Sequence, residues 1–142
     1  MTVVLTGGVF DMLHVGHVRL LERARVLGDC LIVAVQEDEH VATVAGKNRP
    51  ILSTVERMEM VGALRCVDRV VSYQSGTDGE IVRRIMPDLL VHGDDWEAQA
   101  DRSTVKAVLR SIGGELVLLP RTVGVSTSDL RRRVLDAACH TG

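Results

Sequence analysis

Short apolar segments alternate with longer amphipathic segments along the whole chain. The apolar segments are rich in Val, Ile and Leu and lack regular polar alternation, a pattern typical of strands that are covered on both faces of a sheet. We expect five such strands, at Thr2–Thr6, Cys30–Gln36, Asp68–Tyr73, Asp88–His92 and Glu115–Leu119.

The segments between these strands have a helical pattern. In the first of them Leu20, Leu21, Ala24 and Leu27 fall on one helical face, and Gly28 follows as a C-terminal stop. Pro87 ends a later helix sharply. The further helices are expected over Thr54–Arg65, Thr77–Met86, Arg102–Ile112 and Ser126–Ala138.

Strands and helices that alternate through such short connections predict the α/β class. We expect one domain over residues 1–142, folded as a Rossmann-like three-layer sandwich with a five-stranded parallel sheet. In such folds ligands bind beyond the carboxyl ends of the strands, where the strand order reverses. This rule selects the loops that follow Thr6, Gln36, His92 and Leu119.

The composition indicates which classes of partner and which cellular compartment to expect. Of 142 residues, 46% are hydrophobic and 25% are charged, and the formal net charge is −2. A chain without a broad basic field is a poor partner for nucleic acid or an anionic membrane. Three widely spaced cysteines with no CxxC pair favour buried small apolar residues or free thiols in a reducing compartment over a disulfide framework. Since no signal segment is visible, we expect a cytoplasmic protein.

The loop after the first strand carries two histidines. His14 and His17 are three residues apart across the predicted start of a helix, after the pair Gly7-Gly8. The free N–H groups and the positive dipole end of a helix suit an anion, and neutral imidazole donors could stabilise charge on a phosphoryl group. The alternatives are a metal site, with Asp11 as the one nearby third ligand, and surface histidines at this spacing by chance.

The loop before the last helix carries Arg121 and three successive hydroxyls, Ser126 to Ser128. With a second helix N-terminus, these groups could hold the β- and γ-phosphates of a nucleoside triphosphate. Ser126 and Asp129 also fit a capping box, which explains both residues structurally. The two interpretations are compatible, because a capped helix end still offers its other amides.

Both loops resemble signatures of one known family. The first resembles the HxGH signature of the cytidylyltransferase-like nucleotidyltransferases, and the last resembles their RTxGxSTT signature, with Ser128 in place of threonine. Gly-Asp-Asp-Trp-Glu at Gly93–Glu97 is similar to glycerol-3-phosphate cytidylyltransferases, and the resemblance covers essentially the whole chain. It implies transfer of CMP from CTP, with Mg²⁺, to a small phosphate- or phosphonate-bearing acceptor, with release of pyrophosphate. It also implies a homodimer.

The resemblance assigns roles by position. Catalytic roles fall on His14, His17, Lys47 and Arg121, and acceptor binding on Asp11, Lys47 and Arg57. Nucleotide binding falls on Gly8, Val9, Phe10, Asp11, Gly16, Arg65, Gly93, Asp94, Asp95, Trp96, Arg121, Thr122, Gly124, Val125, Ser126, Thr127 and Ser128. No residue is expected to bind a metal. Without the resemblance, the charged residues outside the two signature loops also fit solvated surface or turn positions.

The acceptor stays open at this point. The segments 43–45 and 75–80 lack lysines that the glycerol-phosphate enzymes have there. One alternative is an adenylyltransferase of the same superfamily that uses ATP with a sugar phosphate or a flavin precursor. Another, of a different class, is a nucleotide-binding module without turnover.

Overall fold

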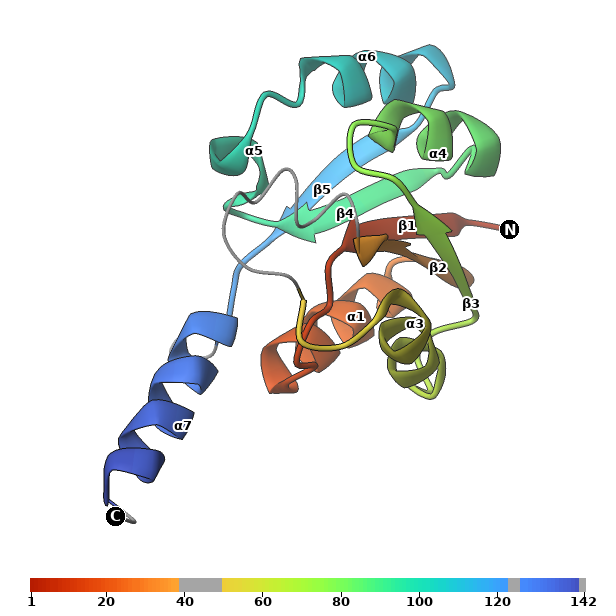
Figure 1. The fold of residues 1–142 in the computed structure, drawn as a ribbon. Coiled ribbons are helices and arrows are strands. Elements are labelled where there is room, and N and C mark those ends of the chain that lie inside the picture. The colour runs from red at the N-terminus through yellow and green to blue at the C-terminus, as the bar shows by residue number, and fades with distance from the viewer. Residues whose placement is uncertain (39–49, 123–125, 141–142) are drawn as a thin grey trace.

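The computed structural model describes residues 1–38, 50–122 and 126–140, and its centre is a parallel sheet of five strands (Figure 1). The strand order is β3-β2-β1-β4-β5, and every neighbouring pair is parallel. The predicted five-stranded parallel sheet is therefore confirmed. The strands are β1 (Val3–Gly8), β2 (Cys30–Gln36), β3 (Arg69–Tyr73), β4 (Leu89–Gly93) and β5 (Glu115–Leu119).

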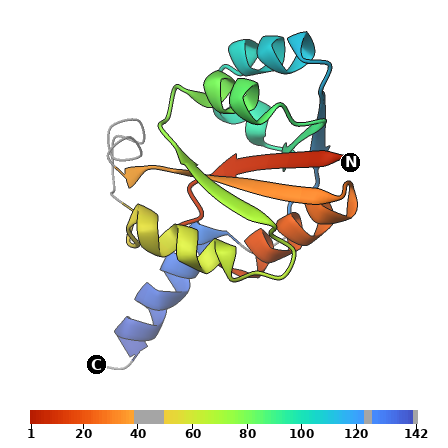
Figure 2. The same cartoon turned by 90° about the vertical axis from the view of Figure 1, so that its right-hand side faces the viewer.

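Helices cover both faces of this sheet. Helices α1 and α3 lie on one face and α4 and α6 on the other, while α7 extends away from the body (Figure 2). This arrangement is the predicted three-layer sandwich. The helices are α1 (Val15–Val26), α3 (Thr54–Gly62), α4 (Asp78–Ile85), α5 (Trp96–Gln99), α6 (Ser103–Ser111) and α7 (Thr127–His140). Among the described helices, none combines the length and the apolar character needed to cross a membrane.

The central strands explain the unbroken apolar runs of the sequence. In β2, Leu31 and Val33 pack in the core beneath α1 and α3, whereas Ile32 and Ala34 pack in the core beneath α4 and α6. All four are at most 6% exposed. Since both faces of the strand are buried, neither face selects polar residues.

The first strand is longer than expected. β1 continues to Gly8, and Gly7 and Gly8 pair with Ala34 and Val35 of β2. The glycine pair thus belongs to the sheet and not to the loop, and neither glycine has a positive φ. A Cβ at Gly8 would lie 3.2 Å from the Phe10 ring, which makes close packing the reason for a glycine there.

Helices α3 and α5 also differ from the prediction, while other bounds shift by only one or two residues. Helix α3 ends at Gly62, three residues before the expected Arg65, because two successive turns at Leu64 and Val67 lead the chain into β3. Helix α5 was not expected. With four residues it is too short to show a helical period in the sequence.

The side chain of Arg57 is fully buried, on the inner face of α3. Its guanidinium donates hydrogen bonds to three backbone carbonyls, to a hydroxyl and to a carboxylate. The acceptors are Val9 O (2.7 Å), Gln36 O (2.7 Å), Leu52 O (3.0 Å), Thr54 Oγ1 (3.2 Å) and the Asp38 carboxylate. The network ties the loop after β1 and the end of β2 to the start of α3. A buried charge is tolerated when it is paired and hydrogen-bonded in this way.

Replacing Arg57 with methionine is expected to destabilise the protein strongly. The change leaves three carbonyls without a buried donor and Asp38 without its partner, so we expect a loss of about 3–5 kcal/mol in the free energy of unfolding. Urea unfolding measures this loss. Arg110→Met, at an exposed position of α6, is the control and should cost less than about 0.5 kcal/mol. Equal losses in the two variants would contradict the bracing role of Arg57.

Candidate active site

A cleft of about 930 Å³ lies at the carboxyl edge of the sheet. All five strand ends contribute to its wall, through Gly7, Gln36, Tyr73, His92 and the segment 120–122 after β5. The strand order reverses between β1 and β4, which is where the fold rule places a ligand. Of the four loops selected from the sequence, those after β1, β4 and β5 line the cleft. At the end of β2 only Gln36 lines it among the described residues, and residues 39–49 of the loop that follows lie outside the described part of the chain. The loop after β3 was not expected to line the cleft, but it does so through Ser75 and Gly76.

The two histidines of the first loop build the start of α1. His14 is the N-cap residue, and its Nδ1 accepts a hydrogen bond from the Gly16 amide at 3.0 Å. The Nδ1 of His17 accepts one from the His14 amide at 3.2 Å, which completes a capping box. The two rings stack with their centroids 3.9 Å apart.

These contacts fix the tautomer of both imidazoles. A ring nitrogen that accepts from a backbone N–H carries no proton, so the proton of the neutral ring is on Nε2. Both histidines line the cleft. Burial lowers the pKa of His14, and burial together with His14 lowers the pKa of His17 to about 4. At neutral pH the site therefore holds two uncharged imidazoles with Nε2–H donors.

The last loop joins the same cleft through contacts of Pro120 and Arg121. The Arg23 guanidinium of α1 donates to the carbonyl oxygen of Pro120 at 3.2 Å. Arg121 lies 3.5 Å from the Asp94 carboxylate and 3.2 Å from that of Asp95, both in the loop after β4. These links hold the loops after β1, β4 and β5 around one space. His14, His17, Arg121 and Thr122 are thus brought together, although more than a hundred residues separate the two loops.

The loop between β1 and α1 has a strained backbone. Phe10 and Met12 have φ values of 54° and 51°, in the left-handed region that residues with a Cβ seldom adopt. Contacts on both sides fix this conformation. Arg57 holds the carbonyl of Val9, and the Asp11 carboxylate accepts from the amides of residues 51 and 52 at 2.9 and 3.1 Å.

The structure places the residues of the sequence prediction in three groups. Those that line the cleft are Gly8, Val9, Phe10, His14, Gly16, His17, Gly93, Asp95, Trp96, Arg121 and Thr122. Those that do not line it are Asp11, Arg57, Arg65, Asp94, Ser126 and Ser128. Lys47, Gly124, Val125 and the side chain of Thr127 lie outside the described residues.

The second group has other contacts or positions. Asp11 and Arg57 make the bracing hydrogen bonds given above, which occupy the groups expected to bind an acceptor. Arg65 is exposed in the turn before β3, at the opposite edge of the sheet from the cleft. The Ser126 hydroxyl donates to the Asp129 carboxylate at 2.8 Å and accepts from the Asp129 amide at 3.0 Å, so it caps α7.

Several residues that line the cleft were not predicted from the sequence. Arg23 follows Gly16 and Leu20 on one face of α1 at i, i+4 and i+7, and this spacing could have identified it. Asp78 and Arg102 also line the cleft. They follow β3 and the unexpected helix α5, and no local pattern connects them.

Across the described residues, no three His, Cys, Asp or Glu side chains come together to hold a metal ion, so the two-histidine metal alternative finds no third ligand there.

His92, at the end of β4, lies in the wall of the cleft. Its ring stacks on Trp96 with centroids 4.3 Å apart and planes at 4°. Burial, with a smaller contribution from Arg102, lowers the pKa of His92 to about 3. The ring is therefore neutral throughout the physiological range.

The chain belongs to the cytidylyltransferase-like family, whose model matches residues 5–133. The predicted family is therefore confirmed, and so is the predicted enzyme class, a nucleotidyltransferase. Among its relatives, the bifunctional protein HldE of Syntrophotalea carbinolica is 38% identical over 95% of this chain, and that of Nitrosococcus oceani is 42% identical over 90%. The chain spans only 27% of the length of each of these two relatives.

Two solved structures have a similar fold. A lipopolysaccharide core biosynthesis protein from Thermoplasma volcanium has a TM-score of 0.72 and 31% identity, over 86% of this chain and 98% of its own. Pantoate-β-alanine ligase from Francisella tularensis has a TM-score of 0.61 at 13% identity, over 93% of this chain and 65% of its own. The second likeness concerns the fold alone.

Substituting His14 separates its structural role from its chemical one. Asparagine is a preferred N-cap, so His14→Asn keeps the cap while it removes the Nε2–H donor. We expect turnover to fall by about 10²–10³, the cost of one lost donor to a charged transition state. The unfolding free energy should change by less than about 0.5 kcal/mol. His14→Ala should lose turnover equally and about 1 kcal/mol of stability besides. Full turnover in either variant would reject the proposed donor.

The lowered histidine pKa values predict a loss of stability in acid. The unfolded chain takes up protons near pH 6.5, whereas folded His17 and His92 do so only near pH 4 and 3. Their contribution is complete above pH 6.5 and is lost as the pH falls toward 4. Between pH 7.5 and 5.5, wild type should lose about 1 kcal/mol more unfolding free energy than His92→Phe. Urea unfolding at both pH values tests this, and equal losses would contradict a neutral buried His92.

Proposed function

We propose that this domain is an adenylyltransferase that transfers AMP from ATP to a sugar phosphate and releases pyrophosphate. The observation that carries the proposal is the single cleft that contains both the histidine pair and Arg121. The likeness to HldE proteins, over almost the whole chain, favours ATP with a sugar phosphate over CTP with glycerol phosphate. The similarity to a lipopolysaccharide core protein also favours a sugar acceptor.

The triphosphate lies across the start of α1 in this proposal. The Nε2–H groups of His14 and His17 bind the α-phosphoryl oxygens, next to the positive end of the helix. Arg23 and Arg121 line the cleft beside them and hold the β- and γ-phosphates. Arg121 exchanges its carboxylate partners Asp94 and Asp95 for phosphate. Because its side chain is 66% exposed, this exchange displaces little packing.

One displacement completes the reaction. A phosphate oxygen of the acceptor attacks the α-phosphorus and forms a new P–O bond, while the bond from the α-phosphorus to the bridging oxygen breaks and pyrophosphate leaves. The attacking oxygen is ionised at neutral pH, so no strong general base is required. Catalysis then consists of positioning and charge stabilisation by the imidazole and guanidinium donors.

Magnesium belongs to the nucleotide substrate in this proposal. The described residues include no protein metal site, and the phosphate oxygens supply the hard ligands that Mg²⁺ prefers. The role predicted for Lys47 near the phosphates stays a prediction. The Ser126 hydroxyl caps α7, so this proposal does not assign it to the phosphates. The predicted homodimer and cytoplasmic location stay predictions.

Cytidylyl transfer is the second candidate. The segments Gly93–Glu97 and Leu119–Thr122 resemble the glycerol-3-phosphate cytidylyltransferases, and both adjoin the cleft. This resemblance favours CTP as the donor nucleotide. The two candidates share the histidine chemistry and differ in the base and the acceptor.

Nucleotide binding and pyrophosphate release distinguish the two candidates. Titration calorimetry with ATP and CTP, each with Mg²⁺, should show at least tenfold tighter binding of ATP. Pyrophosphate release should then require a sugar phosphate and should not be supported by glycerol phosphate. Tighter binding of CTP with turnover of glycerol phosphate would establish the second candidate instead. Binding of either nucleotide without turnover of any acceptor would support a nucleotide-binding module.

A further inference from the structure

One arm of the cleft has no part in binding the triphosphate. It lies toward α4 and α6, and several of the side chains that line it are polar. Its residues are Ser75, Gly76, Asp78, Gly79, Gln99, Ala100, Asp101, Arg102 and Thr104. In an in-line displacement the acceptor approaches the α-phosphorus from the side opposite to the leaving pyrophosphate. This arm is therefore the space that remains for the acceptor, a conclusion that rests on the proposed function.

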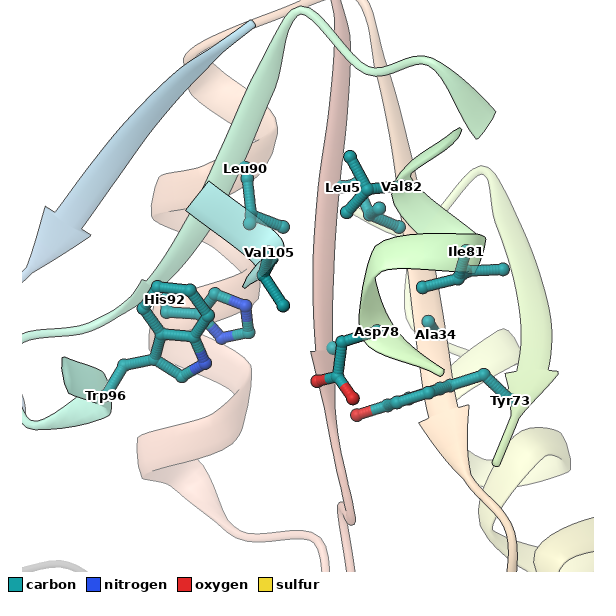
Figure 3. A pocket seen from close by; sticks show the side chains of 11 residues that line it. Leu5, Ala34, Tyr73, Asp78, Ile81, Val82, Leu90, His92, Trp96 and Val105 are labelled. Carbon is teal, nitrogen blue, oxygen red and sulfur yellow. The ribbon is translucent and has the colours of Figure 1, made fainter. Parts of the chain in front are cut away.

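Next to this arm, two pairs of side chains that also line the cleft form a slot. Tyr73 and Asp78 face His92 and Trp96 across it, as Figure 3 shows. The same four side chains help to line a niche of about 20 Å³, enough for one water molecule or one small substituent. Apolar side chains form most of the wall of the niche, at Leu5, Ala34, Ile81, Val82, Leu90 and Val105.

The walls of this slot are fixed before any ligand binds. Trp96 is only 5% exposed, and it contacts both the His92 ring and the Arg102 guanidinium, which lies 4.6 Å from its ring centroid. The Nε of Arg102 donates to the Trp96 carbonyl at 3.0 Å, and its Nη1 lies 3.9 Å from the Asp78 carboxylate. A site held in this way loses little side-chain freedom when a ligand enters.

The chemistry of the slot matches hydroxyl groups. Asp78 offers carboxylate oxygens that accept hydrogen bonds, and the neutral His92 ring offers one donor and one acceptor. Within the described residues, no hydrogen bond occupies the ring nitrogens of His92. A quaternary ammonium group is disfavoured, because it requires open aromatic faces, and Trp96 is covered by His92 and Arg102.

We propose that the slot formed by Tyr73, Asp78, His92 and Trp96 binds the hydroxylated carbon chain of the acceptor. Asp78 accepts hydrogen bonds from its hydroxyl groups, and His92 exchanges hydrogen bonds with a neighbouring one. The slot thereby selects polyhydroxylated phosphates over simple alkyl phosphates. Asp78 and His92 are specificity-determining residues, and neither takes part in the displacement at phosphorus.

Acceptor kinetics test the slot. Asp78→Asn should raise KM for the preferred sugar phosphate by about 10–100-fold, and His92→Phe by about 3–10-fold, as expected for lost charged and neutral hydrogen bonds. His92→Gln should restore part of the loss. ATP affinity should stay within twofold in all three variants, and KM for propyl phosphate should not change. Glu80→Gln, an exposed change of the same kind on α4, is the matched control and should match wild type.

The outcomes separate this inference from the proposed function. Unchanged KM for the sugar phosphate in both Asp78→Asn and His92→Phe, or equal rises for sugar and propyl phosphates, would overturn the slot alone. Turnover of CTP with glycerol phosphate would overturn the adenylyl proposal, and the same KM changes are then expected for glycerol phosphate. If no acceptor is turned over, titration calorimetry tests the slot instead, by measuring the binding of the sugar phosphate and of propyl phosphate to protein loaded with a non-hydrolysable ATP analogue. Failure of both phosphates to bind there would overturn the slot.

Discussion

The buried guanidinium of Arg57 is the interaction on which the geometry of the site depends. It joins three stretches of chain that are far apart in the sequence, at Val9, Gln36 and Leu52. The loop after β1 is thereby held with two residues in the left-handed region, a conformation that the loop would not keep by itself. Since α1 begins directly after this loop, the position of the histidine pair follows from the network.

The histidines themselves serve both the fold and the site. In each ring one nitrogen completes the capping of α1, and this contact leaves the proton on the other nitrogen. Capping and charge stabilisation are thus performed by the same side chains. Burial keeps the rings neutral, so the cleft presents donors to a phosphoryl group without placing two adjacent positive charges at the helix start.

The sequence was most informative where local pattern and burial agree. The buried runs predicted the strands, with β2 and β5 at their observed bounds, and the spacing of His14 and His17 predicted their shared space. The sequence could not predict whether Arg57 and Asp11 bind a ligand or brace the loop, because the contacts that brace it join residues 48 and 41 positions apart. The slot was missed for the same reason. Tyr73 and Trp96 meet only through the strand order and a four-residue helix.

The central claim is that both signature loops bind one triphosphate. Nuclear magnetic resonance of protein labelled with ¹⁵N tests it most directly, by titration of ATP with Mg²⁺ and observation of the histidine ring nitrogens and the Arg121 Nε. The account predicts that signals of His14, His17 and Arg121 shift together along one saturation curve. Shifts at Arg121 with unchanged histidine signals, or two curves with separate midpoints, would contradict it.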